Sequence, residues 1–419
     1  MRPEQLRARA ESHLDARPWL APLVFCLSVL ARLVLSFVTT TGLNMVDLRV
    51  YTYGAATVFH GELYTFTFSD MTPNFPLPFT YPPFAALLFY PLHWLPFLLL
   101  AVLWLVATMV AVWVVVRISL QLLLGERSEQ RHWRVAALLW AALSIWLEPV
   151  RTTLDYGQVN VFLVLGALLA VRSGRWWVGG GIVGLLAGVK LTPAITGLYF
   201  FVRRNVAAAG FSAVAFAGTV ALSFLIIRDE ARTYFGELAG DASRIGPVGS
   251  AINQSLRGVL SRFAGHDVGT GISWALAVVL TLALCLLAWR GLDRDDRLGI
   301  LLMVELFGLL VSPISWSHHW VWFIPAMVWL VHGPLRQLRV AKFSAGIGLV
   351  IMLVGVIQIL LRLQPSIWEH DRPVLESAVG AVYPLGAVAI LGLMALQRWL
   401  LRPRQPAAVS PSRVPRPVR

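Results

Sequence analysis

Long apolar runs separated by short polar segments recur along nearly the whole chain of 419 residues. A run of roughly twenty apolar residues is the length that an α-helix needs to cross a bilayer. Helices also satisfy their own backbone hydrogen bonds in lipid. The pattern predicts an all-α integral membrane protein with about twelve transmembrane helices. The predicted spans are residues 19–40, 95–116, 135–149, 159–171, 176–189, 193–203, 206–227, 272–289, 298–312, 319–333, 343–361 and 378–398.

Two of the apolar stretches are short. The run 193–203 can span upright only if other helices flank it. The stretch 81–92, "YPPFAALLFYPL", is bracketed by prolines, which favours a helix lying at the membrane interface. Making 81–92 a span and merging 176–203 into one helix also gives twelve spans. That alternative places the basic segment "GERSEQRHWR" outside, so we prefer the first assignment.

The distribution of charge orients the chain. With the N-terminus inside, the inner segments hold 24 of the 35 Lys and Arg residues, the outer segments hold 10, and Arg32 lies in the first span. This agrees with the positive-inside rule for a multi-pass protein of the cell membrane. We expect 1–18 to be cytoplasmic and uncleaved, and the basic, Pro-rich tail 399–419 to be cytoplasmic and disordered. Two long outer loops result, 41–94 and 228–271.

Composition supports membrane insertion and narrows the partners. Hydrophobic residues make up 57% of the chain and charged residues 14%, and the 17 Trp residues suit membrane interfaces. The net charge of +13 is scattered over short inner segments, which favours contact with anionic lipid over nucleic-acid binding. Cys26 and Cys285 both lie in apolar runs without metal-ligand spacing.

Six short motifs carry polar residues to the outer face. They are "VDLRVY", "FTYPPF", "LDYGQVN", "GVKLTP", "NQSLRG" and "SPISWSHHW". Lys, Arg and His around one acid suit a site that holds a phosphate and deprotonates a hydroxyl. A carboxylate close to cations also stays ionised, as a base must. The chain shows none of the common metal, nucleotide or Ser and Cys nucleophile motifs, and "DLR" lacks paired acids, so we expect no metal or other cofactor.

These residues also have plain structural alternatives. Asp47 could be a solvated acid at a helix exit, and Lys190 could extend its charge to the interface. His318 and His319 could simply be interfacial, and since neighbours on a helix point about 100° apart, we expect only one of them to face a given site.

Four further charges stay open in the same way. Arg257 and Arg262 lie in a loop and by default are solvated. Arg32 and Glu305 lie within predicted spans, where a charge is costly and faces the bundle interior. For both, a structural pairing is as consistent with the sequence as a catalytic role.

Together the six motifs resemble glycosyltransferase family 87 of the GT-C superfamily, over about residues 19–330. The family includes actinobacterial α-1,2-mannosyltransferases that use polyprenyl-phosphate-mannose to extend phosphatidylinositol mannosides or to branch lipomannan. The resemblance implies the GT-C fold: a seven-helix catalytic module over 19–227, with interfacial helices in its first loop. The second long loop 228–271 and five further helices over 272–398 would follow.

The resemblance also implies roles. Asp47 matches the general base that deprotonates the acceptor hydroxyl, so that a β-linked donor gives an α-1,2 linkage by an inverting single displacement. The donor would be polyprenyl-phosphate-mannose and the acceptor a mannosylated glycolipid, meeting at the extracytoplasmic face. The matching phosphate-binding positions are Lys190, Arg257, His318 and His319, and the candidates for sugar or acceptor binding are Tyr81, Gln158, Asn160 and Asn253.

Two other functions are consistent with the sequence. Another GT-C transferase would use a different polyprenyl-phosphate sugar, such as arabinose or glucose. A lipid-linked-sugar flippase or transporter would place polar residues along a path through the membrane, and Arg32 and Glu305 keep this alternative open. The outer-face gathering of the polar motifs favours a transferase.

Overall fold

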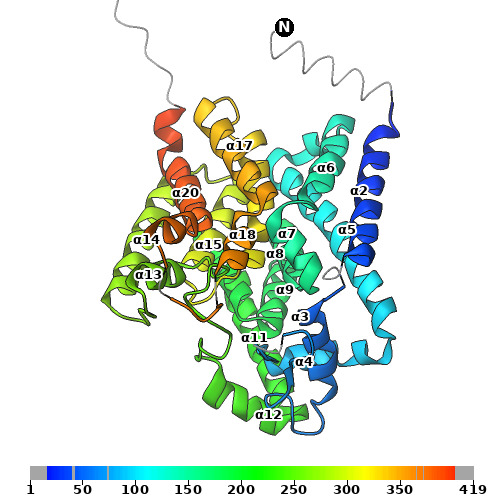
Figure 1. The fold of residues 1–419 in the computed structure, drawn as a ribbon. Coiled ribbons are helices and arrows are strands. Elements are labelled where there is room, and N and C mark those ends of the chain that lie inside the picture. The colour runs from blue at the N-terminus through cyan, green and yellow to red at the C-terminus, as the bar shows by residue number, and fades with distance from the viewer. Residues whose placement is uncertain (1–16, 40–42, 73–74, 365, 371, 402–419) are drawn as a thin grey trace, which may run out of the picture.

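The computed structural model describes residues 17–39, 43–72, 75–364, 366–370 and 372–401. Within these ranges the chain is mostly helical, as the apolar pattern predicts (Figure 1). The predicted cytoplasmic segment 1–18 and the predicted tail 399–419 lie largely outside the described residues.

Long apolar helices make this a multi-pass membrane protein. Among the described residues, five helices are long and apolar enough to cross a membrane, and the number is seven when each of two bent pairs counts as one span. The first pair bends by 65° and the second by 41°. The five are α2 (Leu20–Val38), α5 (Phe97–Leu124), α11 (Val206–Ile226), α14 (Ile272–Gly291) and α20 (Val382–Leu400), and the pairs are α6 (Arg131–Ser144) with α7 (Glu148–Tyr156) and α17 (Arg339–Val354) with α18 (Val356–Leu363).

Shorter helices occupy the other predicted spans. The count of twelve transmembrane helices stays a prediction, because these helices fall below the length of a full span. A break after Val189 separates two of them, so the merged helix over 176–203 is not formed. They are α8 (Asn160–Arg172), α9 (Trp176–Val189), η4 (Thr192–Ile195) with α10 (Thr196–Val202), α15 (Arg297–Val311), and η6 (Ser317–Trp322) with α16 (Phe323–His332).

The two long loops fold into short elements of their own. In the first loop, α4 has seven residues, so it is about 10 Å long and cannot cross a bilayer. Two short antiparallel strands pair in the same loop, with Thr67 opposite Pro78, and the sequence did not predict them. The short elements of the two loops are α3 (Val46–Arg49), η1 (Val50–Gly54), β1 (Thr67–Phe68), β2 (Leu77–Pro78), α4 (Pro83–Phe89), η2 (Tyr90–Trp94), α12 (Arg228–Thr233), η5 (Tyr234–Leu238) and α13 (Leu256–Ala264). Two further short elements, η3 (Gly125–Glu129) and α19 (Val374–Val379), lie outside these loops.

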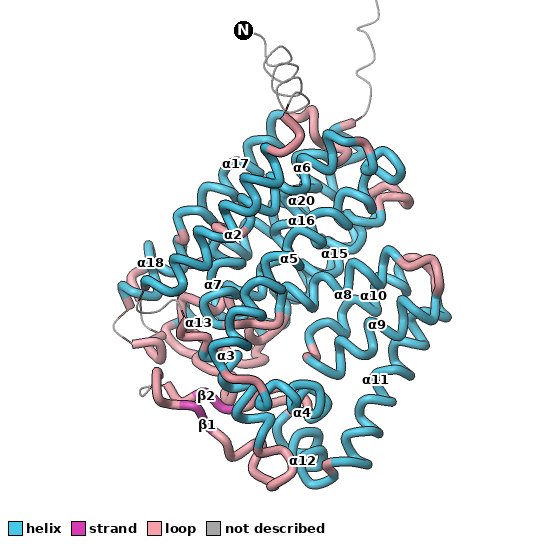
Figure 2. Tube along the Cα trace, turned by 90° about the vertical axis from the view of Figure 1, so that its right-hand side faces the viewer, coloured by secondary structure: helices cyan, strands magenta, loops and turns pink. Residues whose placement is uncertain are grey.

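The long helices and the short elements occupy different ends of the molecule. In Figure 1, α2 begins and α20 ends at the top, whereas α3, α4 and α12 gather at the bottom. The rotated view places β1 and β2 at that same lower end (Figure 2). The folded loops therefore sit together at one end of the helix bundle.

Close packing of α9 against α11 fixes where α9 ends. Gly180, Gly184 and Gly188 recur every fourth residue and so lie on one face of α9. A Cβ atom at Gly184 would lie 2.5 Å from the Ala215 Cβ, and one at Gly188 would lie 2.5 Å from the Thr219 Oγ1. Small residues of this kind let membrane helices approach closely.

We expect Gly184→Ala to lower the free energy of unfolding by roughly 1–3 kcal/mol, because the added methyl group overpacks the helix contact. Gly181→Ala is the matched control on the same helix, since its Cβ would meet only Phe211, at 3.5 Å. The control should be neutral or stabilising by up to about 1 kcal/mol, because Ala favours helix. Thermal unfolding in detergent measures both variants, and equal midpoints would contradict the packing argument.

Candidate active site

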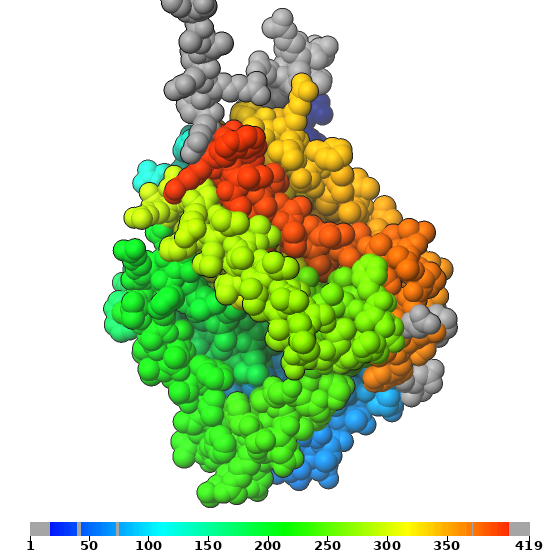
Figure 3. Space-filling view, turned by 90° about the vertical axis from the view of Figure 1, so that its left-hand side faces the viewer, coloured from blue at the N-terminus to red at the C-terminus, as the bar shows by residue number. Residues whose placement is uncertain are grey.

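A large cavity of about 830 Å³ opens between the folded loops and the helix bundle. Its volume falls within the roughly 300–1,000 Å³ of small-molecule sites. Both long loops, the segment 312–319 and the end of α18 contribute to its wall. Figure 3 shows a hollow on one face of the molecule, between the green surface that includes α11 and the yellow-green surface that includes α14.

Asp47 lies in the first turn of α3 and lines this cavity. The preceding Met45 has a positive φ of 43°, and its N–H donates to the backbone oxygen of Asp155 at 3.0 Å. Burial raises the pKa of Asp47 to about 6, although a hydrogen bond from Gln158 and the charge of Lys190 both lower it. The carboxylate is therefore mostly ionised at pH 7 and can accept a proton.

A hydrogen-bonded group of side chains orients Gln158 toward Asp47. The Gln158 Oε1 accepts hydrogen bonds from the hydroxyl of Tyr51 at 3.0 Å and the hydroxyl of Tyr81 at 3.3 Å. Those two hydroxyl groups are 2.7 Å apart. With Oε1 occupied as an acceptor, the amide nitrogen of Gln158 is the group that donates to the carboxylate.

Lys190 follows α9 directly and points into the same cavity. Its Nζ donates to the Asn160 Oδ1 at 2.9 Å, lies 3.1 Å from the His319 Nε2, and stands 5.3 Å from the centre of the Tyr81 ring. Burial lowers the pKa of Lys190 to about 7, and the negative charge of Asp47 opposes this shift. The site thus places a cation close to an ionised carboxylate.

Both histidines line the cavity, so the expectation that only one of them faces the site is wrong. They lie in the 3₁₀ helix η6 instead of a regular α-helix, and their ring centres are 4.9 Å apart. Neither ring nitrogen of His318 has a hydrogen-bond partner among the described residues, although the side chain is buried. A buried polar atom without a partner is costly, which favours a ligand at this position.

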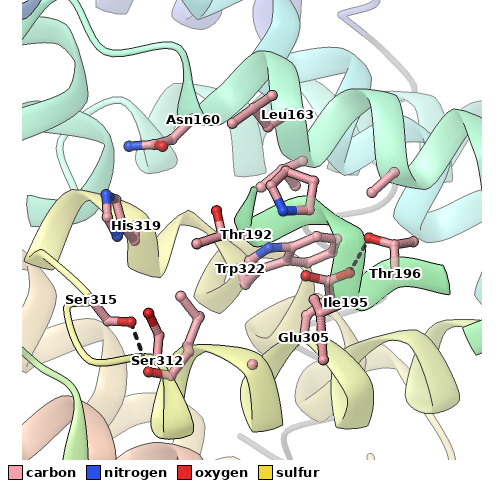
Figure 4. A pocket seen from close by; sticks show the side chains of 15 residues that line it. Asn160, Leu163, Thr192, Ile195, Thr196, Glu305, Ser312, Ser315, His319 and Trp322 are labelled. Atoms are coloured by element: carbon pink, nitrogen blue, oxygen red, sulfur yellow. Dashed lines mark hydrogen bonds between the residues drawn. The ribbon is translucent and has the colours of Figure 1, made fainter. Parts of the chain in front are cut away.

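A second, smaller cavity of about 50 Å³ adjoins the first and shares His319, Thr192 and Ser312 with it. Figure 4 shows Asn160 and His319 at one end of this cavity and Glu305 with Thr196 at the other. The Thr196 hydroxyl donates to the Glu305 carboxylate at 2.5 Å.

Two predicted site residues are not among the described residues that line either cavity. Arg257 forms two hydrogen bonds with Asp267, at 2.9 and 2.6 Å, on α13 and the loop after it. The Asn253 side chain bonds to loop backbone instead: its Nδ2 donates to the oxygen of Val248 at 2.8 Å, and its Oδ1 accepts from the N–H of Ser315 at 2.9 Å. Asn253 therefore joins the second long loop to the segment that carries the histidines.

The structure also gives partners for two of the charged residues whose roles the sequence left open, Arg262 and Arg32. Arg262 is 2% exposed, so its solvated alternative is wrong. Its guanidinium donates to the backbone oxygens of Ser250 and Gly380, each at 2.9 Å. Arg32 forms a salt bridge with Asp155, which joins α2 to α7.

The family model of glycosyltransferase family 87 matches residues 79–313, more than half of the chain. The chain belongs to glycosyltransferase family 87.

Several relatives are similar to the chain over most of their length. A polyprenol-phosphate-mannose-dependent α-(1-2)-phosphatidylinositol pentamannoside mannosyltransferase of Mycobacterium tuberculosis (strain CDC 1551 / Oshkosh) is 52% identical, over 92% of this chain and 90% of that protein. Its namesake in Mycolicibacterium smegmatis is 51% identical, over 90% of this chain and 92% of that protein. A polyprenol-phosphate-mannose-dependent α-(1-2)-phosphatidylinositol mannoside mannosyltransferase of Mycobacterium tuberculosis (strain ATCC 25618 / H37Rv) is 33% identical, over 86% of this chain and 89% of that protein. No solved structure matches the chain.

The sequence motifs did not single out several residues that line this cavity or bond to its side chains. Tyr51, which bonds to Gln158, lies in "VDLRVY", and Trp316 lies in "SPISWSHHW". Both motifs were assigned to the site, but neither residue was given a role in it. Arg244 and Trp368 also line the cavity, but they stand in loop sequence with no periodicity or motif to single them out.

The pair Arg32–Asp155 should be energetically coupled. Asp155→Asn leaves the buried Arg32 without a carboxylate and should cost about 1–3 kcal/mol of unfolding free energy. We expect less than for a fully buried pair because the Asp155 side chain is 32% exposed. The double variant with Arg32→Met should lose less than the two single variants together. Thermal unfolding in detergent of all four proteins measures this, and additive losses would show that the pair is not coupled.

Proposed function

We propose that this family 87 enzyme transfers mannose from polyprenol-phosphate-mannose to a phosphatidylinositol mannoside and forms an α-(1-2) linkage. The donor, acceptor and linkage are those in the names of the relatives that are 51% and 52% identical. The observation that carries the proposal is that Asp47 and Lys190 line one cavity and their charges interact there. A proton acceptor beside a cation suits attack of a hydroxyl group with departure of a phosphate.

In this mechanism Asp47 is the general base. The acceptor hydroxyl oxygen attacks C1 of the mannosyl group while its proton passes to the Asp47 carboxylate. The bond between C1 and the phosphate oxygen breaks, and its electron pair leaves with the polyprenol phosphate. A single displacement inverts the configuration at C1, so a β-linked donor gives an α-linked product. Gln158 holds the carboxylate in place through its amide group.

The carrier phosphate binds between Lys190, His318 and His319. All three line the cavity, and His318 keeps both ring nitrogens without a partner among the described residues. Asn160 supports this group, since its side chain accepts from Lys190 and donates to the backbone oxygen of His318 at 3.1 Å. Arg257, bound to Asp267, is left out of the phosphate site.

Among the acceptor candidates, Tyr81 and Gln158 line the large cavity and stand beside the reacting groups. Asn160 and Asn253 act as supports for the segment that carries the histidines. We assign the recognition of acceptor hydroxyls to Tyr81 and Gln158.

We further propose a GT-C fold with twelve spans and an active site on the extracytoplasmic face. The excess of Lys and Arg in the inner segments supports this orientation. The cavity also lies among the folded loops, opposite the end where α2 begins and α20 ends (Figure 1). The catalytic module would comprise 19–227, and the second long loop 228–271 and five C-terminal helices over 272–398 would follow it.

The two charges that kept the flippase alternative open, Arg32 and Glu305, give it little support in the structure. Arg32 is bound to Asp155, and Glu305 accepts from Thr196. Both therefore have structural partners. Arg32 is not among the described residues that line either cavity, and Glu305 lies at the far end of the smaller cavity, whose volume of about 50 Å³ is far below the roughly 300–1,000 Å³ of small-molecule sites.

Asp47→Asn should lower turnover by about 100- to 10,000-fold, because general-base catalysis contributes that much. The assay is mannose transfer by the purified protein from polyprenyl-phosphate-mannose to phosphatidylinositol mannosides. Asp229→Asn, a 92%-exposed side chain of α12, is the matched control and should keep its activity. Near-normal turnover by Asp47→Asn would assign the base elsewhere. Transfer of a different sugar, with none of mannose, would favour the alternative donor.

The pH dependence of kcat/KM should be bell-shaped, because it reports the essential acid and base of the free enzyme. Activity should fall as the pH drops through about 6, since Asp47 becomes protonated. It should also fall as the pH rises above about 7, since Lys190 loses its charge.

Lys190→Arg separates the two limbs, because a guanidinium stays charged at high pH. The variant should keep the acid limb and lose the alkaline limb, whatever its maximal rate. An unchanged alkaline limb in Lys190→Arg would show that a group other than Lys190 titrates there.

A further inference from the structure

Three aromatic side chains form a continuous patch on the wall of the large cavity, which we call the aromatic wall: Phe75, Trp316 and Trp368. The ring centres of Phe75 and Trp368 are 5.5 Å apart, at an angle of 75°. Gly246 lies against the rings of both Trp316 and Phe75. A Cβ atom at Gly246 would be 2.9 Å from the Trp316 ring and 3.1 Å from the Phe75 ring. Segments distant in sequence thus converge on one surface.

Trp368 is the exposed member of the aromatic wall. It is 50% exposed although it lines a cavity, so half of its surface is free to contact a ligand. The helix before it is held in place by Gln364, whose Oε1 accepts from the N–H of Ala251 at 3.3 Å and whose Nε2 lies 3.5 Å from the Ser250 hydroxyl. The second long loop therefore fixes where the Trp368 loop begins.

Polar groups line the same cavity as these rings. Asp241 and Arg244 line the same cavity, and Arg244 donates to the backbone oxygen of Tyr64 at 2.6 Å. A pyranose has apolar C–H faces and a rim of hydroxyl groups, so it suits aromatic surfaces with hydrogen-bonding groups at their edge. A prenyl or acyl chain would instead suit a purely apolar lining.

The position of the wall relative to the reacting groups follows from the chain. Trp316 precedes His318 by two residues, so the wall begins beside the proposed phosphate site and continues to Trp368. We propose that the aromatic wall binds the inner mannosyl residues of the acceptor, while the terminal residue reaches Asp47. This inference rests on the proposed function. It assigns to the wall a preference for acceptors that carry several sugars.

The test uses purified full-length protein, polyprenyl-phosphate-mannose, and two phosphatidylinositol mannosides with short and long mannosyl chains. Trp368→Ala should lower kcat/KM for the long acceptor on the order of tenfold, through a higher KM, with little change for the short acceptor or the donor. Trp368→Phe keeps an aromatic face and should recover most of the loss. Trp177→Ala is the matched control, because Trp177 is also 50% exposed and is not among the described residues that line either cavity.

Several results would overturn the inference. If Trp368→Ala kept the kcat/KM for both acceptors, the aromatic wall would not bind the acceptor. An equal loss of kcat/KM with both acceptors would indicate a structural role for Trp368. A raised donor KM would assign the wall to the carrier lipid.

Equilibrium binding of the long acceptor, measured for the same variants in detergent, separates this inference from the proposed function. Weaker binding by Trp368→Ala alone would support the wall even if the wild type transferred no mannose, in which case the proposed function would fail. Equal binding by all variants would overturn the wall even if transfer were normal.

Discussion

The salt bridge between Arg32 and Asp155 is the interaction on which the geometry of the site depends. It joins the middle of α2 to the last turn of α7. The backbone oxygen of Asp155 accepts from Met45, and a Cβ atom at Gly157 would lie 2.6 Å from the Leu48 Cβ. The short helix α3, with its carboxylate, is thus pressed against the end of α7. This pair of charges in the helix bundle therefore helps to fix the position of Asp47 in the wall of the cavity.

The cation reaches the same point by a different physical route. The glycine face of α9 lets this helix lie directly on α11, so the residue after its last turn, Lys190, emerges at a fixed place. Asn160 at the start of α8 then bonds to the ammonium group. A charge pair therefore helps to position the base, which lies in the folded first loop, and close helix packing positions the cation.

The sequence predicted the parts of this arrangement that follow from apolar runs. The ends of such runs place polar residues at the surface of the helix bundle, which is why Asp47, Gln158 and Lys190 were singled out and all line one cavity. Arg257 and Asn253 in the second long loop were assigned to the site only because "NQSLRG" resembles a family motif, and their side chains bond to Asp267 and to loop backbone. The direction of a loop side chain depends on tertiary contacts that one sequence does not encode locally.

The aromatic wall was beyond the same reasoning for a related cause. Trp residues are common at membrane interfaces, so a single Trp in this chain carries little information. The role of Trp368 can be inferred only from the fold, in which its ring contacts Phe75. Phe75 lies nearly three hundred residues earlier in the chain. The sequence contains 17 Trp residues, and only the fold distinguishes those in the cavity from those that face lipid.

The closeness of Asp47 and Lys190 also bears on how charge moves during the proposed transfer. A phosphodiester donor carries one negative charge and the departing phosphate carries two, while the carboxylate loses its charge as it takes the proton. Negative charge therefore passes from the Asp47 carboxylate to the departing phosphate, and the total charge in the cavity does not change. A fixed ammonium group that lies closer to the phosphate than to the carboxylate binds the transition state more strongly than the ground state. The low-dielectric setting that shifts both pKa values toward neutrality also strengthens that preference.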